Sequence, residues 1–136
     1  MTQVGNPAAR QIGTVQKVLA VDDEEVMGYV IQRIVKHLGY EVDWVTSCET
    51  ALEKIRRGRY DVILSDFKTP TMDGERFYDE VAGLDNSLLK KMIFITGDTV
   101  SHSTLRFFKR AEVPFLSKPF RIDELEKLIQ QAAEAR

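Results

Sequence analysis

A short apolar run that ends at an aspartate constrains this chain more than any other feature of its sequence. Residues Val62–Leu64 are consecutive and apolar, a composition typical of a strand buried on both faces of a parallel sheet. The run ends at Asp66, and the segment that follows contains Pro70 and Gly74, which are typical of turns. Asp66 is therefore predicted at the end of a buried strand, at the edge where open α/β sheets bind ligands. A simple turn cap is the alternative for an isolated aspartate in this position.

Further apolar runs and helical patterns alternate with this strand along a chain of 136 residues, which is enough for one domain. The other predicted strands cover Val18–Val21, Glu41–Val45, Met92–Thr96 and Val113–Leu116. The predicted helices cover Val26–Leu38, Glu49–Arg57, the residues from Gly74 to about Leu84, Ser103–Arg110 and a last helix that begins near Ile122. Five strands alternating with five helices predict an α/β fold with a doubly wound parallel sheet and right-handed crossovers.

The ends of the first two helices carry recognisable signals. Ser47 is a predicted N-cap for the second helix, while Gly39 and Gly58 are predicted to end the first and second helices. The apolar face predicted for the first helix consists of residues that recur at helical spacing: Val26, Val30, Ile31, Ile34, Val35 and Leu38.

Composition narrows the function classes. With 19 basic and 21 acidic residues the net charge is −2, so no general attraction to nucleic acid or to an anionic membrane is expected. No apolar run is long enough to span a bilayer, and the single cysteine, Cys48, excludes a disulfide framework and a thiolate metal site. Residues 1–16 lack an apolar signal core and are predicted to be a flexible N-terminal leader before a domain over residues 17–136. A cytoplasmic protein is expected.

Polar residues that end the predicted strands share one edge of the sheet. Asp22 and Asp23 follow the first strand, Asp66 ends the third, Thr96 ends the fourth and Lys118 follows the fifth. Because the carboxyl ends of parallel strands lie at one edge, three carboxylates, a hydroxyl and an ammonium group are predicted to converge there. Each residue alone fits a structural role, but their shared placement indicates a functional site.

Acids continue beyond Asp23, because Glu24 and Glu25 come next in the chain. Acids near a helix N-terminus oppose the helix dipole, so these two are interpreted as complementing and capping the first helix.

The residue types at this edge point to phosphoryl chemistry. Three carboxylates without a histidine or cysteine partner suit a hard divalent cation with oxygen ligands, above all Mg²⁺. An aspartate can also act as a nucleophile toward phosphorus and form an aspartyl phosphate. A cation, a hydroxyl and an ammonium group would hold the phosphoryl oxygens, since phosphoryl transfer depends chiefly on positioning and charge stabilisation.

The ordered motifs resemble the receiver domain of two-component response regulators of the chemotaxis-regulator kind. They are Asp22-Asp23, Asp66 with Pro70 and Met72-Asp73-Gly74, Thr96, and Lys118-Pro119-Phe120. The resemblance covers residues 17 to about 133. It implies a flavodoxin-like fold with strand order 2-1-3-4-5. It also implies a phosphoryl-accepting signalling switch in a two-component phosphorelay, not an enzyme with a separate catalytic output domain.

This resemblance assigns the phosphoacceptor and the Mg²⁺ ligands. Asp66 matches the phosphoacceptor. Asp23 and Asp66 match the direct Mg²⁺ ligands together with the carbonyl of Lys68, whereas Asp22 would act through a water molecule. Mg²⁺ is therefore the expected cofactor.

The resemblance also assigns the residues that hold the phosphoryl group and transmit the switch. Thr96 and Lys118 match the groups that bind phosphoryl oxygens, and the Lys118–Pro119 peptide bond matches one that is usually cis. Phe115 matches the switch aromatic but replaces the more frequent tyrosine. Because it has no hydroxyl to bond, its switching would depend on burial alone.

Three other classes are compared with this interpretation. A flavin-binding domain of the same fold would need a phosphate loop after the first strand, where four acids stand. A haloacid-type phosphatase would need a second aspartate at the position of Lys68. The closest alternative is a non-phosphorylated receiver-like interaction module, which usually lacks one of the acids or the lysine. None is missing here, so the phosphoryl-accepting switch is favoured.

The phosphoryl donor is expected to be another protein. His37 is interpreted as a partner of the helix dipole and His102 as exposed, so neither is predicted to be a phosphodonor. A histidine kinase or histidine phosphotransfer protein is the expected partner. The context of Thr96-Gly97-Asp98 and Lys118-Pro119-Phe120 resembles receivers of hybrid histidine kinases. Self-association through the last two helices and the fifth strand is left open, and neither nucleic-acid binding nor membrane insertion is expected.

Two charged residues near the site are predicted to tune the lifetime of the phosphoryl group. Lys68 lies two residues after Asp66 and Asp98 lies two residues after Thr96, so both would flank the path of an attacking water. The alternative is that they are solvated surface charges, worth at most about 1 kcal/mol.

The output surface is predicted over residues 101–110, residues 113–116 and the last helix. Leu105 and Phe108 are three residues apart and are predicted to face the core together. Phe107 would then face a partner, in a stretch that is otherwise basic. The alternative is that Phe107 packs beneath the neighbouring loop.

Overall fold

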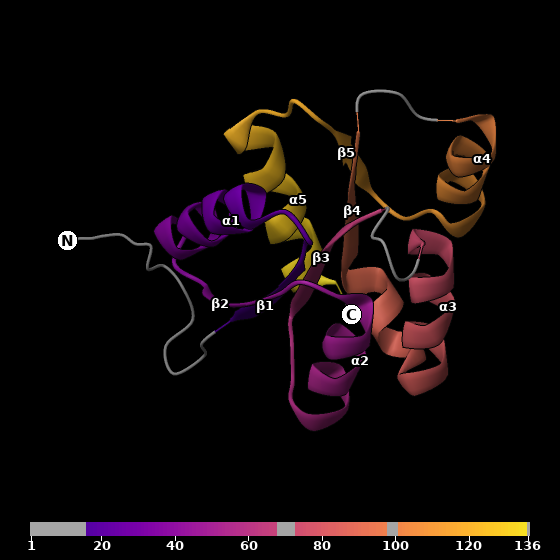
Figure 1. Ribbon diagram of the computed structural model, residues 1–136, viewed down its shortest axis with the longest axis horizontal. Coiled ribbons are helices and arrows are strands. Elements are labelled where there is room, and N and C mark those ends of the chain that lie inside the picture. Colours follow the sequence, from indigo (N-terminus) through magenta and orange to yellow (C-terminus); the bar gives the residue numbers. More distant parts are fainter. Residues whose placement is uncertain (1–15, 68–72, 98–100, 136) are drawn as a thin grey trace.

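The chain folds around one parallel sheet with helices on both faces (Figure 1). The computed structural model describes residues 16–67, 73–97 and 101–135. Within these ranges, five strands are hydrogen-bonded in the order β2-β1-β3-β4-β5. They are β1 (Lys17–Val21), β2 (Glu41–Val45), β3 (Val62–Asp66), β4 (Met92–Thr96) and β5 (Phe115–Ser117). All four strand pairings are parallel, which confirms the predicted fold and strand order.

The helices form two layers that enclose the sheet (Figure 1). They are α1 (Glu25–His37), α2 (Cys48–Arg57), α3 (Gly74–Leu84), α4 (His102–Ala111) and α5 (Ile122–Glu134), with a 3₁₀ helix, η1 (Asn86–Lys91), before β4. One buried cluster joins the sheet to α1 and α5, and the other joins it to α2, α3 and α4. Alternate residues of β1 serve the two clusters, because successive side chains of a strand point to opposite faces.

Local sequence signals account for most helix ends. Ser47 accepts a hydrogen bond from the Thr50 backbone N–H at 3.1 Å, which confirms it as the N-cap of α2. Gly58 is the C-cap of α2, and Gly39 follows α1 with a positive φ of 95° that a side chain would disfavour. Asp73 caps α3 through the Arg76 N–H at 2.8 Å. No helix in the described ranges combines the length and apolar character needed to cross a bilayer.

Several predicted element boundaries shift. The fifth strand starts at Phe115 and not at Val113, so it follows Pro114, which has no backbone N–H to donate to a strand ladder. The second and fourth helices each start one residue earlier than predicted, directly after the N-cap residues Ser47 and Ser101. The 3₁₀ helix η1 was not predicted.

The predicted apolar face of α1 is too wide. Val26 is 78% exposed and Val30 is 39% exposed, whereas Ile31 and Val35 are buried against the sheet. The buried face of the helix begins instead at Gly28.

The predicted orientation of α4 is wrong. Phe107 is buried with Phe108, and Leu105 is 42% exposed. The core positions of this helix are Thr104, Phe107 and Phe108, which follow the spacing i, i+3, i+4 of a single helix face. Phe107 is therefore a core residue and not a partner-facing aromatic.

Candidate functional site

Three acids from two strands meet at the carboxyl edge of the sheet, the side at which the parallel strands end. Asp22 and Asp23 follow β1, and Asp66 is the last residue of β3, which pairs with β1. Each of the three offers a carboxylate oxygen, and these oxygens lie within 4.8 Å of one another. Their exposure is graded, because Asp22 is buried, Asp66 is half-buried and Asp23 is exposed. The fold therefore brings the predicted acids together.

Asp22 is the most constrained of these acids. Its Oδ1 accepts a hydrogen bond from the Glu24 N–H at 2.9 Å, while its buried Oδ2 has no hydrogen-bond partner within the described ranges. Burial raises the pKa of the Asp22 carboxyl, and the Glu24 N–H and the charge of Lys118 oppose that rise. An unpaired buried carboxylate oxygen beside two further carboxylates is unfavourable unless a cation neutralises it. These donors fit a hard cation such as Mg²⁺.

Lys118 reaches the same edge from the segment after β5. Its Nζ lies 3.8 Å from Glu24 Oε1, and its backbone N–H donates to the Thr96 carbonyl at 2.9 Å. The Lys118–Pro119 peptide bond is cis. Thr96 is buried at the end of β4. The predicted lysine and threonine therefore stand at the same edge as the acids.

The side chain of Glu24 does not have the capping role that the sequence suggested. It occupies the N-cap position of α1, but its side chain makes no capping hydrogen bond within the described residues and lies next to Lys118 instead. The Glu24 N–H, in turn, is bound by Asp22. The chain of contacts links the start of α1 to the segment that follows β5.

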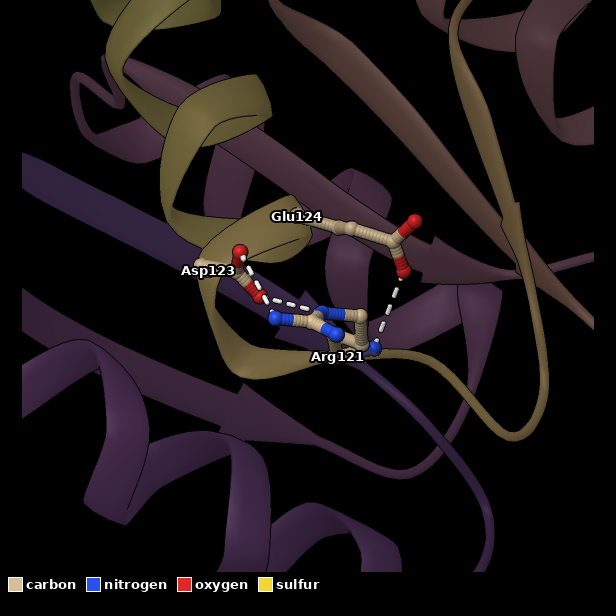
Figure 2. A network of polar contacts seen from close by, with 3 residues as sticks. All are labelled: Arg121, Asp123 and Glu124. Carbon is tan, nitrogen blue, oxygen red and sulfur yellow. Dashed lines mark hydrogen bonds and ion pairs between the residues drawn. The ribbon is translucent and has the colours of Figure 1, made fainter.

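The start of α5 fixes the far end of that segment. Figure 2 shows Arg121, Asp123 and Glu124 pointing toward one another at this helix start. The Arg121 backbone N–H donates to Glu124 Oε1 at 3.0 Å, and the Arg121 Nε donates to Asp123 Oδ1 at 3.0 Å. Carboxylates in a first helical turn also favour the helix dipole. These contacts lie three to six residues beyond Lys118 and define where its segment joins α5.

A cluster of aromatic rings lies directly behind the site. The Phe67 N–H donates to the Ile95 carbonyl at 2.8 Å, so the residue after Asp66 is tied to β4. The Phe67 ring packs edge-on against Phe94 at 5.1 Å and Phe108 at 4.9 Å between centroids. Phe108 in turn stacks on Phe115 at 4.3 Å. Aromatic contacts thus run without interruption from the residue beside Asp66 to β5.

Gly74 permits close packing beside this cluster. A Cβ at this position would lie 2.2 Å from Phe67 Cδ1 and 2.7 Å from the Phe67 carbonyl oxygen. Only glycine therefore allows α3 to begin this close to the residue that follows Asp66.

Lys68 and Asp98, predicted as tuning residues, lie outside the described residues. The same holds for Lys68 as a source of a carbonyl ligand. The half-buried ring of Phe115 lies against Phe108.

Sequence reasoning missed one residue that touches the site. The Trp44 indole Nε1–H donates to the Asp22 backbone carbonyl at 2.9 Å. The sequence gives only a weak signal for it, namely the single tryptophan of the chain on an edge strand that is otherwise short and mixed.

Comparison with known proteins places this geometry in a family. The model for the response regulator receiver domain matches residues 18–130. The two-component response regulator ARR10 of Arabidopsis thaliana is 30% identical over 116 residues, covering 84% of this chain and 20% of that protein. ORR23 of Oryza sativa subsp. indica is 33% identical over 129 residues, covering 91% and 18%. The chain thus spans about a fifth of the length of these curated relatives.

Solved structures agree with the sequence comparison. The chemotaxis protein CheY4 of Vibrio cholerae has a TM-score of 0.78 at 28% identity, covering 88% of this chain and 99% of that one. The receiver domain of sensor histidine kinase PA1611 from Pseudomonas aeruginosa PAO1 has a TM-score of 0.77 at 29% identity, covering 88% and 98%. That structure has a magnesium ion coordinated in its active-site cleft. By its sequence, its sheet topology and its edge of acids, this chain belongs to the response regulator receiver domain family of two-component systems.

Proposed function

We propose that this chain is a phosphoryl-accepting switch of a two-component phosphorelay. In this proposal Asp66 takes a phosphoryl group from a histidine kinase or a histidine phosphotransfer protein in the presence of Mg²⁺. The observation that carries the proposal is the meeting of three carboxylates within 4.8 Å, one of them with a buried oxygen that lacks a partner among the described residues. A purely structural cluster would not retain such repulsion, because similar-sized neutral residues would remove it.

The acids fit the Mg²⁺ site that the family implies. Asp23 and Asp66 would bind the ion directly with the carbonyl of Lys68, and Asp22 would bind through water. When bound, Mg²⁺ supplies positive charge that stabilises the oxygens of the transferring phosphoryl group.

Different residues of the chain have different roles in the phosphoryl transfer. An oxygen of the Asp66 carboxylate attacks phosphorus, an O–P bond forms, and the P–N bond to the donor imidazole breaks. The imidazole leaves with the electron pair of that bond and takes a proton from solvent. The Lys118 ammonium and the Thr96 hydroxyl hold the phosphoryl oxygens, which carry the charge of the transition state.

Phosphorylation is proposed to be transmitted through the aromatic cluster. The Thr96 hydroxyl would shift toward the new phosphoryl group and leave space near β4 and β5. Phe115 has no hydroxyl, so its response would be a change in ring packing against Phe108, its stacked neighbour at 4.3 Å. A buried phenylalanine gains roughly 1.5–3 kcal/mol, enough to bias a two-state equilibrium by tenfold or more.

The output surface is proposed over α4, β5 and α5, in a revised form. Leu105 takes the partner-facing role that the sequence assigned to Phe107, because Leu105 is 42% exposed. Arg106 and Lys109 are exposed on the same helix, so the surface combines an apolar side chain with positive charge. A partner or a second copy of the chain would bind there.

Lys68 and Asp98 are proposed to set how long the phosphoryl group survives. A Lys68→Ala variant is expected to change the rate of dephosphorylation, followed by the decay of the phosphorylated mass. An unchanged rate would mean that Lys68 is only a solvated surface charge.

Phosphoryl uptake from acetyl phosphate tests the proposed function. Intact-mass measurement is expected to show one added phosphoryl group with Mg²⁺ and none with EDTA. Asp66→Ala is expected to abolish uptake, while Asp79→Ala, which removes an exposed acid of α3, leaves it unchanged. Uptake by the folded Asp66→Ala variant would contradict the assignment. A folded wild type that takes up no phosphoryl group would favour the non-phosphorylated interaction module.

A further inference from the structure

Trp44, on β2, contacts both the residue that follows β1 and the helix α1, next to the acidic cluster. It lies on β2, on the face that packs with α1 and α5, and its indole is partly buried. Its Nε1–H donates to the backbone carbonyl of Asp22 at 2.9 Å. The single polar group of this side chain is thus used on the residue whose carboxylate is the most buried of the three acids.

Both backbone polar groups of Asp22, the N–H and the carbonyl, form hydrogen bonds with residues of β2. Its N–H donates to the Val45 carbonyl at 3.1 Å, which extends the pairing of β1 with β2. Its carbonyl accepts a hydrogen bond from the Trp44 indole. This contact holds Asp22 one residue beyond the last paired residue of β1, Val21. The carbonyl belongs to the peptide group that connects Asp22 to Asp23. A fixed plane for this peptide group limits the directions in which both acids can point.

The helix α1 is shaped to receive the indole. A Cβ on Gly28 would lie 2.2 Å from Trp44 Cε2 and 2.4 Å from Trp44 Nε1. Glycine inside a helix is unfavourable, so this position has a packing reason. Any side chain at residue 28 would push away the atom that carries the indole hydrogen.

We propose that Trp44 is a positioning residue for the acidic cluster, acting through the Asp22–Asp23 peptide group on Mg²⁺ binding. This role rests on the proposed function, because it concerns the same site. Groups that hydrogen-bond to the ligands of a metal orient those ligands, and removing one typically weakens binding by 10- to 100-fold. Trp44 acts on a backbone carbonyl and not on a ligand atom, so the expected loss is at the lower end of that range.

A Mg²⁺ titration followed by ¹H–¹⁵N NMR tests this role. Trp44→Phe keeps an aromatic ring but removes the N–H donor. Its dissociation constant for Mg²⁺, taken from the amides of residues 20–24, is expected to rise by about tenfold. Tyr60→Phe is the matched control, because it removes a 2.6 Å hydrogen bond to Asp43 of the same strand on the opposite face. Its Mg²⁺ affinity is expected to equal that of the wild type.

The wild type supplies a second readout that no variant needs. The chain has a single tryptophan, so its spectrum contains one indole N–H signal. This signal is expected to shift on addition of Mg²⁺ with the same midpoint as the amides of residues 20–24. The indole signal decides the matter if Trp44→Phe does not fold.

The outcomes separate this inference from the function on which it rests. A wild type that binds Mg²⁺, together with a Trp44→Phe variant of equal affinity or an indole signal that does not move, overturns the role of Trp44 alone. Equal weakening in Trp44→Phe and Tyr60→Phe also overturns it, because the loss would then follow the stability of β2. A wild type that does not bind Mg²⁺ contradicts the proposed function itself.

Discussion

The carboxyl edge of the sheet and the network on its amino side treat charge in opposite ways. On the amino side, Asp43 accepts a hydrogen bond from Tyr60 Oη at 2.6 Å and forms an ion pair with Lys17 Nζ at 3.3 Å. The Asp61 carboxylate accepts a hydrogen bond from the Lys17 backbone N–H at 2.8 Å. We call these four residues the amino-side network. At the carboxyl edge, three carboxylates approach one another and one oxygen of Asp22 lacks a partner among the described residues.

The two regions differ in how an aspartate charge affects folding. The pKa of Asp43 is lowered, first by the hydrogen bond from Tyr60, so its ionised form stabilises the fold. The pKa of Asp22 is raised, chiefly by burial, so its ionised form is unfavourable in the folded chain. The same residue type therefore has opposite effects on folding at the two places. A carboxylate whose ionised form is unfavourable in the fold is the pattern expected at a site that binds a cation, here the carboxyl edge.

The largest expected effect comes from α3, which runs from the carboxyl edge toward the amino side. Gly74→Ala should destabilise the fold by about 2–3 kcal/mol, because the new Cβ would meet the Phe67 ring and carbonyl. Gly83→Ala, near the other end of the same helix, should stabilise it by about 0.5–1 kcal/mol, because alanine favours helices. Outside the adjacent residues and the backbone of its own helix, a Cβ there would meet no atom of the described residues within 4 Å. Urea denaturation measures both. Equal effects at the two glycines would show that the packing beside Asp66 is not tight.

Breaking the amino-side network should have the next largest effect. Asp43→Ala removes the acceptor of the Tyr60 hydroxyl and is expected to lower the free energy of unfolding by about 2 kcal/mol at neutral pH. Because the folded-state pKa of Asp43 lies below its ordinary value of 3.8, the stabilisation is present above that value and lost as the pH falls through the lowered pKa. The difference between wild type and variant should therefore shrink in acid. A difference that is constant with pH would contradict a charged hydrogen bond.

A neutral residue at the carboxyl edge should have a smaller effect of opposite sign. Asp22→Asn removes one of three crowded negative charges and is expected to raise the free energy of unfolding by about 1 kcal/mol without Mg²⁺. Added Mg²⁺ should stabilise the wild type and leave the variant almost unchanged, because a ligand stabilises only the state that binds it. Thermal unfolding with and without Mg²⁺ measures this. Destabilisation by Asp22→Asn would place Asp22 with the structural acids.

The fold and the site acids were predictable because their signals are local. Buried strands such as β3 read as apolar runs, and parallel pairing brings their polar ends to one edge whatever the details of packing. The orientation of α4 was not predictable from the sequence, because apolar residues lie on both sides of the face that is buried in the structure. The first core position of that helix is Thr104, whereas Leu105 is the more apolar neighbour.

Tertiary contacts were beyond the reach of sequence patterns. The hydrogen bond from Trp44 to Asp22 joins residues 22 positions apart, and no periodicity records it. The contact of Glu24 with Lys118 likewise depends on how the segment after β5 approaches α1. Residue type and order predicted that the three acids would meet, whereas the residues that contact them were visible only in the fold.

Chemical trapping of the phosphorylated residue tests the central claim most directly. The chain is incubated with acetyl phosphate and Mg²⁺ and then treated with borohydride, which reduces an acyl phosphate to the primary alcohol and releases phosphate. Peptide mass spectrometry is expected to find homoserine at position 66 and aspartate at positions 22 and 23, with no conversion when EDTA replaces Mg²⁺. Homoserine at another position, or equal conversion of Asp66 in the presence of EDTA, would contradict a Mg²⁺-dependent phosphoacceptor at Asp66.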